Sequence, residues 1–250
     1  MERFAADAML ARRLATEAGV RLLRVRDEFG SLDVPALRDA GDAAGQQFLA
    51  GELSVGRPED AVLSEEAVDD AVRLTANRVW IIDPLDGTRE FAEGRDDWAV
   101  HVALWSDGDL VAGAVALPAL RRTVATDEPP TVPSRATERP RIAVSRSRAP
   151  RIAQVAAREL DAELVPMGSA GFKAAAVMFG QVDAYIHAGG QYEWDSAAPV
   201  VVAQAAGLHA SRLDGSALVY NRPDPYLPDL MVCRRELAPV LLSVCTPASR

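Results

Sequence analysis

The N-terminal third of the chain carries apolar residues at helical spacing. Between residues 4 and 28 they recur every three or four positions, with arginines and glutamates between them, which predicts an amphipathic helix. Asp33-Val34-Pro35 interrupts this pattern, and a second helical stretch covers 40–52 and ends near Gly51. A third, shorter helix is predicted over 67–75.

From Val79 onward the apolar residues fall into short runs. Val79-Trp80-Ile81-Ile82 is closed by Asp-Pro, which predicts a buried strand that ends in a loop. Residues 98–105 and 110–117 predict two strands joined by a turn, and 122–126 is a weaker strand candidate. Residues 127–140 are rich in proline, threonine and charge without periodicity, which predicts an exposed linker.

After residue 140, strand and helix patterns alternate. Strands are expected at 141–145, 163–166, 182–187 and 229–233, and helices at 150–160, 169–179, 195–206 and 235–244. This alternation predicts an α/β (α+β) fold with two lobes. We expect an N-terminal α+β lobe over 1–126, a linker over 127–140, and a C-terminal α/β lobe over 141–250.

Composition and charge limit the classes of function that this chain can have. The 250 residues are 49% apolar and 25% charged, as in ordinary globular proteins. No apolar run approaches the ~20 residues that cross a bilayer, and the N-terminus lacks signal-peptide features, so a cytoplasmic protein without a membrane partner is expected. The net charge of −9 argues against a nucleic-acid partner. Cys233 and Cys245 are interpreted as small apolar filler.

The main candidate for chemistry is the run Asp83-Pro84-Leu85-Asp86-Gly87-Thr88. It places two carboxylates and a hydroxyl where a strand gives way to a loop. Closely spaced carboxylates and a backbone carbonyl can supply the oxygen ligands that Mg²⁺ requires. The same residues also favour an ordinary capped turn, so this run alone leaves both interpretations open.

Two distant segments add further acids. Glu65 and Glu66 follow a short apolar run, and Asp195 precedes a long apolar helix. Taken singly, the glutamates are explained as solvated charges at a helix start, and Asp195 as a helix N-cap. Together with Asp83–Thr88, they have the order and character of one known constellation.

The segments LSEE, WIIDPLDGTREF and EWDSAAPVVVAQAAG resemble the signature segments of the inositol monophosphatase superfamily. The resemblance implies a layered αβαβα sandwich with the active site between two lobes, and a lithium-sensitive, Mg²⁺-dependent phosphatase that binds two or three ions. It also implies that homodimers are an option. The metal ligands it implies are Glu65, Asp83, the carbonyl of Leu85, Asp86 and Asp195. Thr88, Glu65 and Asp42 would position the attacking water, with Glu66 as an accessory acid.

Two segments of the C-terminal lobe bear on the substrate. Ser145-Arg146-Ser147-Arg148 resembles the Ser-Arg-Ser-His run of the 3'(2'),5'-bisphosphate nucleotidases, with Arg148 where histidine is usual. Arg146 can grip a phosphate with two hydrogen bonds, although a solvated strand end explains the run equally well. The small residues of 168–171 precede a helix that contains Lys173, a candidate anion site, unless Lys173 is an ordinary surface lysine.

The substrate expected from these features is a nucleotide bisphosphate. The inositol monophosphatases carry a glutamate shortly before their Trp-Asp pair that reads ring hydroxyls, whereas His187–Gln191 has no acid at the matching place. The chain therefore most resembles the CysQ-type nucleotidases of actinobacteria, which convert 3'-phosphoadenosine 5'-phosphate to AMP and phosphate and so clear a by-product of sulfate assimilation. The predicted substrate-binding residues are Asp86, Gly87, Thr88, Ser145, Arg146, Ser147, Ser169, Ala170, Lys173, Gln191 and Asp195. Tyr192 is open to either a base contact or packing.

Two alternatives compete with this prediction. One is an inositol-1-monophosphatase or fructose-1,6-bisphosphatase of broad specificity, which would use the same chemistry. The other is a regulatory binding protein without catalytic activity. Loss of a metal ligand would mark the second alternative, and Glu65, Asp83, Asp86, Thr88 and Asp195 are all present.

Overall fold

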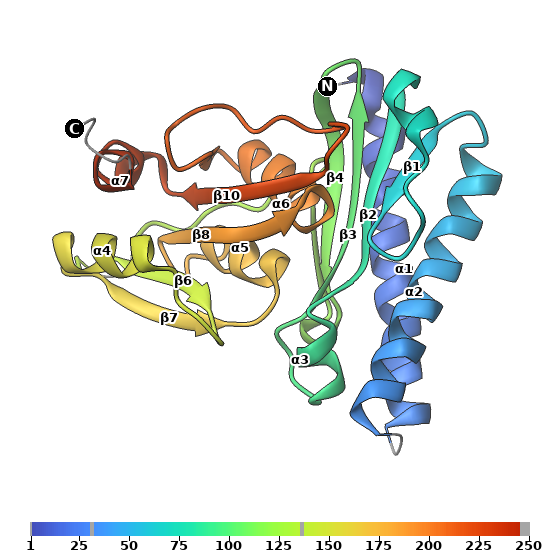
Figure 1. Cartoon of the computed structure of the whole chain (residues 1–250), viewed down its shortest axis with the longest axis horizontal. Helices are drawn as coiled ribbons and strands as arrows, with labels where there is room; N and C mark the ends of the chain where they lie inside the picture. Colours follow the sequence, from blue (N-terminus) through green and yellow to red (C-terminus); the bar gives the residue numbers. More distant parts are fainter. Residues whose placement is uncertain (1, 31–32, 136–137, 246–250) are drawn as a thin grey trace.

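The computed structural model describes residues 2–30, 33–135 and 138–245, so part of the predicted linker, at 136–137, and the chain end at 246–250 lie outside it. Two sheets and six long helices form five layers (Figure 1). Helices α1 (Ala5–Phe29) and α2 (Val34–Gly56) cover the outer face of the first sheet. Helices α5 (Ala170–Met178) and α6 (Glu193–Ala205) lie between the sheets, and α4 (Arg151–Glu159) and α7 (Ala238–Cys245) cover the second. The predicted αβαβα sandwich is confirmed.

The first sheet has the strand order β1-β2-β3-β4-β5, and only its β1–β2 pair is parallel. Its strands are β1 (Ala61–Ser64), β2 (Arg78–Asp86), β3 (Ala99–Ser106), β4 (Asp109–Leu117) and β5 (Arg122–Ala125). The second sheet has the order β7-β6-β8-β10-β9. Its strands are β6 (Arg141–Ser145), β7 (Glu163–Met167), β8 (Ala184–Tyr192), β9 (His209–Ser211) and β10 (Tyr226–Cys233).

Strand β2 contributes side chains to two hydrophobic cores, one on each face of the first sheet. Successive strand residues point to opposite faces, so Val79 and Ile81 enter the core with α5 and α6, whereas Trp80 and Ile82 enter the core beneath α1 and α2. A third core joins the second sheet to α4 and α7, and there both free, buried cysteines serve as apolar filler. None of the helices in the described ranges is long and apolar enough for a membrane span.

Three element predictions need correction. Helix α2 begins at Val34 rather than near residue 40, because Asp33 caps it and Pro35 lies in the first turn, where no N–H bond is lost. The predicted helix at 67–75 is only a 3-10 turn, Ala71–Thr75. Strand β2 continues to Asp86, and its pairing with β3 is irregular between Asp83 and Asp86.

The short strands β1 and β9 were not predicted, because their few residues carry no clear alternation. The remaining predicted helices and strands are present, with bounds shifted by a few residues. Short segments complete the chain: the helix α3 (Thr88–Ala92) and the 3-10 turns Glu2–Phe4, Pro118–Leu120 and Arg235–Leu237.

Candidate metal centre and substrate site

Parallel pairing of β1 and β2 places the first two acids together. Ser64 lies opposite Ile82 in the register, so the next residues, Glu65 directly after β1 and Asp83 within β2, lie side by side. In addition to desolvation, the charge of Glu65 is close enough to contribute to the raised pKa of Asp83. The β1–β2 pairing therefore places two carboxyl groups next to each other.

Asp86 and Asp195 join this pair. Asp195 lies in the first turn of α6, and carboxylate oxygens of Asp83, Asp86 and Asp195 lie within 4.8 Å of one another. We call Glu65, Asp83, Asp86 and Asp195 the acidic cluster. Asp195 is the third helical residue and not the N-cap, and its Oδ2 accepts the backbone N–H of Tyr192 at 2.6 Å.

Mutual repulsion shapes the acidic cluster. Desolvation, followed by the charges of Glu65, Asp86 and Asp195, raises the pKa of Asp83 well above its usual range. Desolvation and neighbouring carboxylates also raise the pKa of Glu65 to about 7 and that of Asp195 to about 6. The Oδ2 of Asp83 is buried without a hydrogen-bond partner. Converging oxygens that repel one another fit a hard divalent cation, which these residues can hold.

Asp86 differs from the rest of the acidic cluster because donors surround it. The start of α5 provides the Ser169 hydroxyl, the Ala170 N–H at 3.1 Å and the Gly171 N–H at 2.7 Å. Although desolvation raises its pKa, the charge and contact of His101 and the Ser169 hydrogen bond lower it to about 2. Asp86 is therefore a carboxylate at any pH near neutrality.

The turn after Asp86 brings the Thr88 hydroxyl next to helix α2. Gly87 has a φ of 90° and lies against Ser169 and Trp98, so a side chain there would be strained and crowded. The turn places Thr88 Oγ1 at 3.3 Å from Asp42 Oδ1 on α2 and at 3.1 Å from the Leu85 carbonyl oxygen. Desolvation and the charge of Glu66 raise the pKa of Asp42 to about 6.

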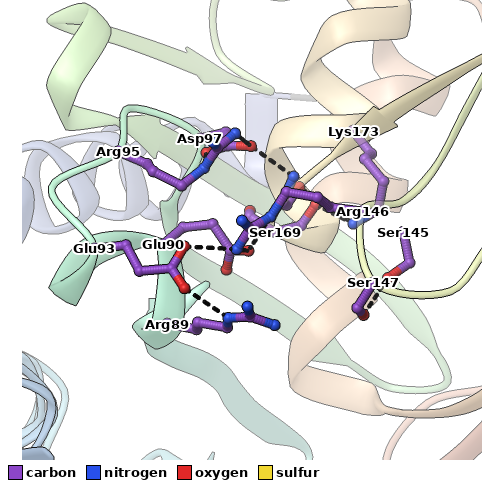
Figure 2. A network of polar contacts seen from close by, with 11 residues as sticks. Arg89, Glu90, Glu93, Arg95, Asp97, Ser145, Arg146, Ser147, Ser169 and Lys173 are labelled. Atoms are coloured by element: carbon purple, nitrogen blue, oxygen red, sulfur yellow. Dashed lines mark hydrogen bonds and ion pairs between the residues drawn. The ribbon is translucent and has the colours of Figure 1, made fainter. Parts of the chain in front are cut away.

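The predicted residues from the C-terminal half form a second set, which we call the C-terminal group. It consists of Ser145, Arg146, Ser147, Ser169, Ala170, Lys173 and Gln191. Figure 2 shows the Arg146 guanidinium contacting Glu90 on α3 and Glu93 directly after α3, each at 2.8 Å. The Ser145 and Ser147 hydroxyls lie 3.2 Å apart. Arg146 is thus already paired with two carboxylates and is not a solvated strand end.

Lys173 and Gln191 are buried, at 6% exposure each, which excludes the interpretation of Lys173 as a surface lysine. Lys173 Nζ donates to the carbonyl oxygens of Gly168 and Ser169, at 3.2 and 2.5 Å. Desolvation lowers its pKa, against the opposing effect of nearby carboxylates. Gln191 donates to the Tyr185 hydroxyl at 2.8 Å. Tyr192 is 44% exposed and stacks on Trp194.

Sequence reasoning missed three residues around these groups. His101 is fully buried in β3 against Asp83 and Asp86. Glu90 holds Arg146, and Asp97 accepts the Gly168 N–H at 2.7 Å while pairing with Arg95 (Figure 2). In the sequence, the only indication that His101 has a special role is its place inside an apolar strand. The residues it contacts depend on strand register, which the sequence does not show.

The fold and this site define a class of protein. The chain belongs to the inositol monophosphatase family, whose profile matches residues 37–244. It is 54% identical to the 3'-phosphoadenosine 5'-phosphate phosphatase of Mycobacterium leprae, over 95% of this chain and 93% of that protein. It is 30% identical to the 3'(2'),5'-bisphosphate nucleotidase CysQ of Escherichia coli K12, over 86% of this chain and 94% of that protein.

A solved structure agrees with the fold. CysQ from Bacteroides thetaiotaomicron, a bacterial member of the inositol monophosphatase family, superposes with a TM-score of 0.80. The match covers 93% of this chain and 98% of that one, at 24% identity. At 24% identity, this similarity shows a shared fold and nothing beyond it.

Proposed function

We propose that the chain is a Mg²⁺-dependent phosphomonoesterase that hydrolyses 3'-phosphoadenosine 5'-phosphate to AMP and phosphate. The observation that carries the proposal is the convergence of Asp83, Asp86 and Asp195 in a chain 54% identical to a phosphatase of that name. Kinship with CysQ proteins supports a role in clearing this by-product of sulfate assimilation.

The acidic cluster and the Leu85 carbonyl would hold the cation. When bound, Mg²⁺ makes a water molecule acidic enough to attack near neutral pH and offsets the charge of the phosphate. This also explains how a chain with a net charge of −9 can bind an anion, because the acids serve as ligands. Two or three ions, a homodimer and a cytoplasmic location stay predictions.

Thr88 and Asp42 are suited to orient the attacking water. The Thr88 hydroxyl faces two acceptors, Asp42 Oδ1 at 3.3 Å and the Leu85 carbonyl oxygen at 3.1 Å. Its proton is therefore directed to one of them, which leaves an oxygen lone pair to accept a hydrogen bond from water. Such orientation in line with the scissile bond supplies much of the rate in phosphoryl transfer.

The C-terminal group is placed to bind the rest of the nucleotide. Lys173 adds a buried positive charge at the start of α5, and Arg146, directly after β6 of the second sheet, contacts Glu90 on α3, which follows β2 of the first (Figure 2). A phosphate bound here would exchange the Arg146 contacts with Glu90 and Glu93 for its own oxygens, which bind a guanidinium equally well. Arg146 would then read the phosphate that is not hydrolysed.

The experiment compares kcat/KM in the presence of Mg²⁺ for 3'-phosphoadenosine 5'-phosphate, inositol 1-phosphate and fructose 1,6-bisphosphate. We expect kcat/KM for the nucleotide to exceed that for both competitors by at least about 100-fold, because inositol 1-phosphate lacks the second phosphate and fructose 1,6-bisphosphate lacks the nucleoside. A wide preference for either competitor would overturn the nucleotide assignment and favour the broad-specificity alternative.

A further inference from the structure

His101 lies where the elements that carry the acidic cluster meet. It is the third residue of β3 and stands opposite Asp83 in the strand register. Its Nδ1 is 3.0 Å from the carbonyl oxygen of Trp194, the residue before Asp195. Its Nε2 is 3.2 Å from Asp86 Oδ2, and its Nδ1 is 3.9 Å from Asp83 Oδ2. One imidazole therefore contacts β2 at two carboxylates and the first turn of α6.

The burial of this ring is not explained by packing. His101 has 0% exposure, and its Nε2 has no aligned hydrogen-bond partner. The strand positions beside it, Val100 and Val102, are apolar, and an apolar side chain at 101 would avoid the cost of burying an unsatisfied polar atom. The ring nitrogens of His101 instead face the acidic cluster and the Trp194 carbonyl oxygen, so their burial places them against charged and polar groups.

A glycine on a neighbouring helix makes room for the ring. Gly171 has an ordinary helical backbone, where glycine costs about 1 kcal/mol relative to alanine. A Cβ atom on Gly171 would lie 2.0 Å from His101 Nε2, far closer than atoms can approach. The Gly171 N–H also donates to the same Asp86 oxygen that His101 approaches, at 2.7 Å. Gly171 and His101 thus form one complementary pair around Asp86.

We propose that His101 is a positioning residue of the metal centre, which orients Asp86 and the Trp194–Asp195 turn, with Gly171 providing its space. The inference rests on the proposed function only in requiring that the acidic cluster binds a divalent cation. Partners behind metal ligands typically contribute 10–100-fold in metal affinity. His101 is not placed to touch substrate, so its effect passes through the carboxylates.

The test is calorimetric titration of Mg²⁺ into the metal-free full chain, with steady-state kinetics beside it. We expect His101→Ala to raise the Mg²⁺ dissociation constant about 10–100-fold, with a much smaller change in kcat at saturating Mg²⁺. His101→Asn keeps a donor near the Trp194 carbonyl, and His101→Gln keeps one near Asp86. Each of these variants should restore part of the affinity, which a purely structural role would not produce.

Gly171→Ala provides an independent approach to the same residue. Because its methyl group displaces the ring, this variant should weaken Mg²⁺ binding as His101→Ala does. The double variant should then be no weaker than His101→Ala alone, a non-additivity that marks a shared mechanism. Gly51→Ala is the matched control, since a Cβ there meets nothing within 4 Å, and it should bind Mg²⁺ like the wild type.

Two results overturn the inference. One is wild-type Mg²⁺ affinity in a cooperatively folding His101→Ala variant, while Asp86→Asn loses binding. The other is full additivity of Gly171→Ala and His101→Ala. Wild-type Mg²⁺ affinity in Asp86→Asn would instead refute the metal cluster, and with it the proposed function, whatever His101 does.

Discussion

The acidic cluster and the C-terminal group differ in how far the protein already satisfies their polar atoms. Asp83 is buried with an oxygen that has no partner, and its neighbours raise its pKa. In the C-terminal group, Arg146 has two carboxylate partners and Lys173 has two carbonyl partners. The first region needs a cation to relieve repulsion, whereas the second must give up protein contacts before it can bind an anion. We therefore expect the acidic cluster to dominate catalysis and the C-terminal group to set substrate affinity.

The largest effect is expected from Asp86→Asn. Asp86 faces the other carboxylates on one side and the donors of α5 on the other, so the amide removes a ligand charge and places an NH₂ group against N–H donors. We expect kcat/KM to fall by more than about 100-fold. This exceeds the 10–100-fold loss typical when a residue that only hydrogen-bonds to a metal ligand is replaced. Steady-state kinetics at saturating Mg²⁺ measures this change in kcat/KM.

The matched control for this variant is Asp96→Asn, an exposed aspartate ten residues along the chain. It should leave both kcat and KM unchanged. Asp86→Asn should still unfold cooperatively, because the donors of α5 can be met in part by its amide oxygen. Activity within tenfold of the wild type in Asp86→Asn would contradict the assignment of the acidic cluster to the reaction.

A smaller and more selective effect is expected from Arg146→Ala. If Arg146 exchanges Glu90 and Glu93 for the phosphate that is not hydrolysed, its loss should raise KM for 3'-phosphoadenosine 5'-phosphate roughly tenfold or more, the range for hydrogen bonds to charged groups. The KM for 3'-AMP, which lacks the second phosphate, should change little. Comparing the two substrates in one assay separates phosphate recognition from damage to the fold.

Two further variants sharpen this test. Glu93→Gln removes one competitor for the Arg146 guanidinium, so the KM for the bisphosphate should fall. Arg158→Ala removes an exposed arginine in the last turn of α4 and serves as the charge-matched control. An equal rise in KM for both nucleotides in Arg146→Ala would show that the Arg146 contact with Glu90 and Glu93 is structural.

The two regions also differ in how readily the sequence reveals them. The run Asp83–Thr88 is continuous, so its residues stay close in any fold that ends a strand there, and Glu65 needs only the parallel β1–β2 register to reach Asp83. The family resemblance supplied Asp195, more than a hundred positions further on. Because β1 was not predicted, the pattern offered these acids only as candidates, and the family resemblance implied their role as metal ligands.

The pairings that the sequence did not reveal depend on how the layers pack. Arg146 meets Glu90 across 56 positions, and His101 meets Asp86 and Trp194 only through the arrangement of β2, β3 and α6. The burial of Lys173 did leave a signal: α5 is apolar on nearly every side, as expected for a helix enclosed between two sheets. Surface and interior lysines otherwise look alike in a single sequence.

The smallest effect is expected in thermal stability. Asp83, Glu65 and Asp195 have pKa values raised by the fold, to about 7 for Glu65 and about 6 for Asp195. Their stabilising contribution to the metal-free chain is complete below the unfolded pKa near 4 and is lost as the pH rises through 6 and 7. Mg²⁺ binds the deprotonated groups, so its stabilisation should grow over the same interval.

Scanning calorimetry with and without Mg²⁺ at pH 5.5 and pH 8 measures this difference. At about 100 times the dissociation constant, a ligand adds about 2.7 kcal/mol, which corresponds to roughly 5–10 °C in a chain of this size. We expect that increment at pH 8 and a markedly smaller one at pH 5.5. Asp86 has a pKa lowered to about 2 and does not titrate in this interval, so Asp86→Asn should remove the Mg²⁺ increment at both pH values. If the Mg²⁺-dependent increase in thermal stability of the wild type did not change with pH, Mg²⁺ would not bind at these titrating carboxyl groups. The acidic cluster would then not be the metal site.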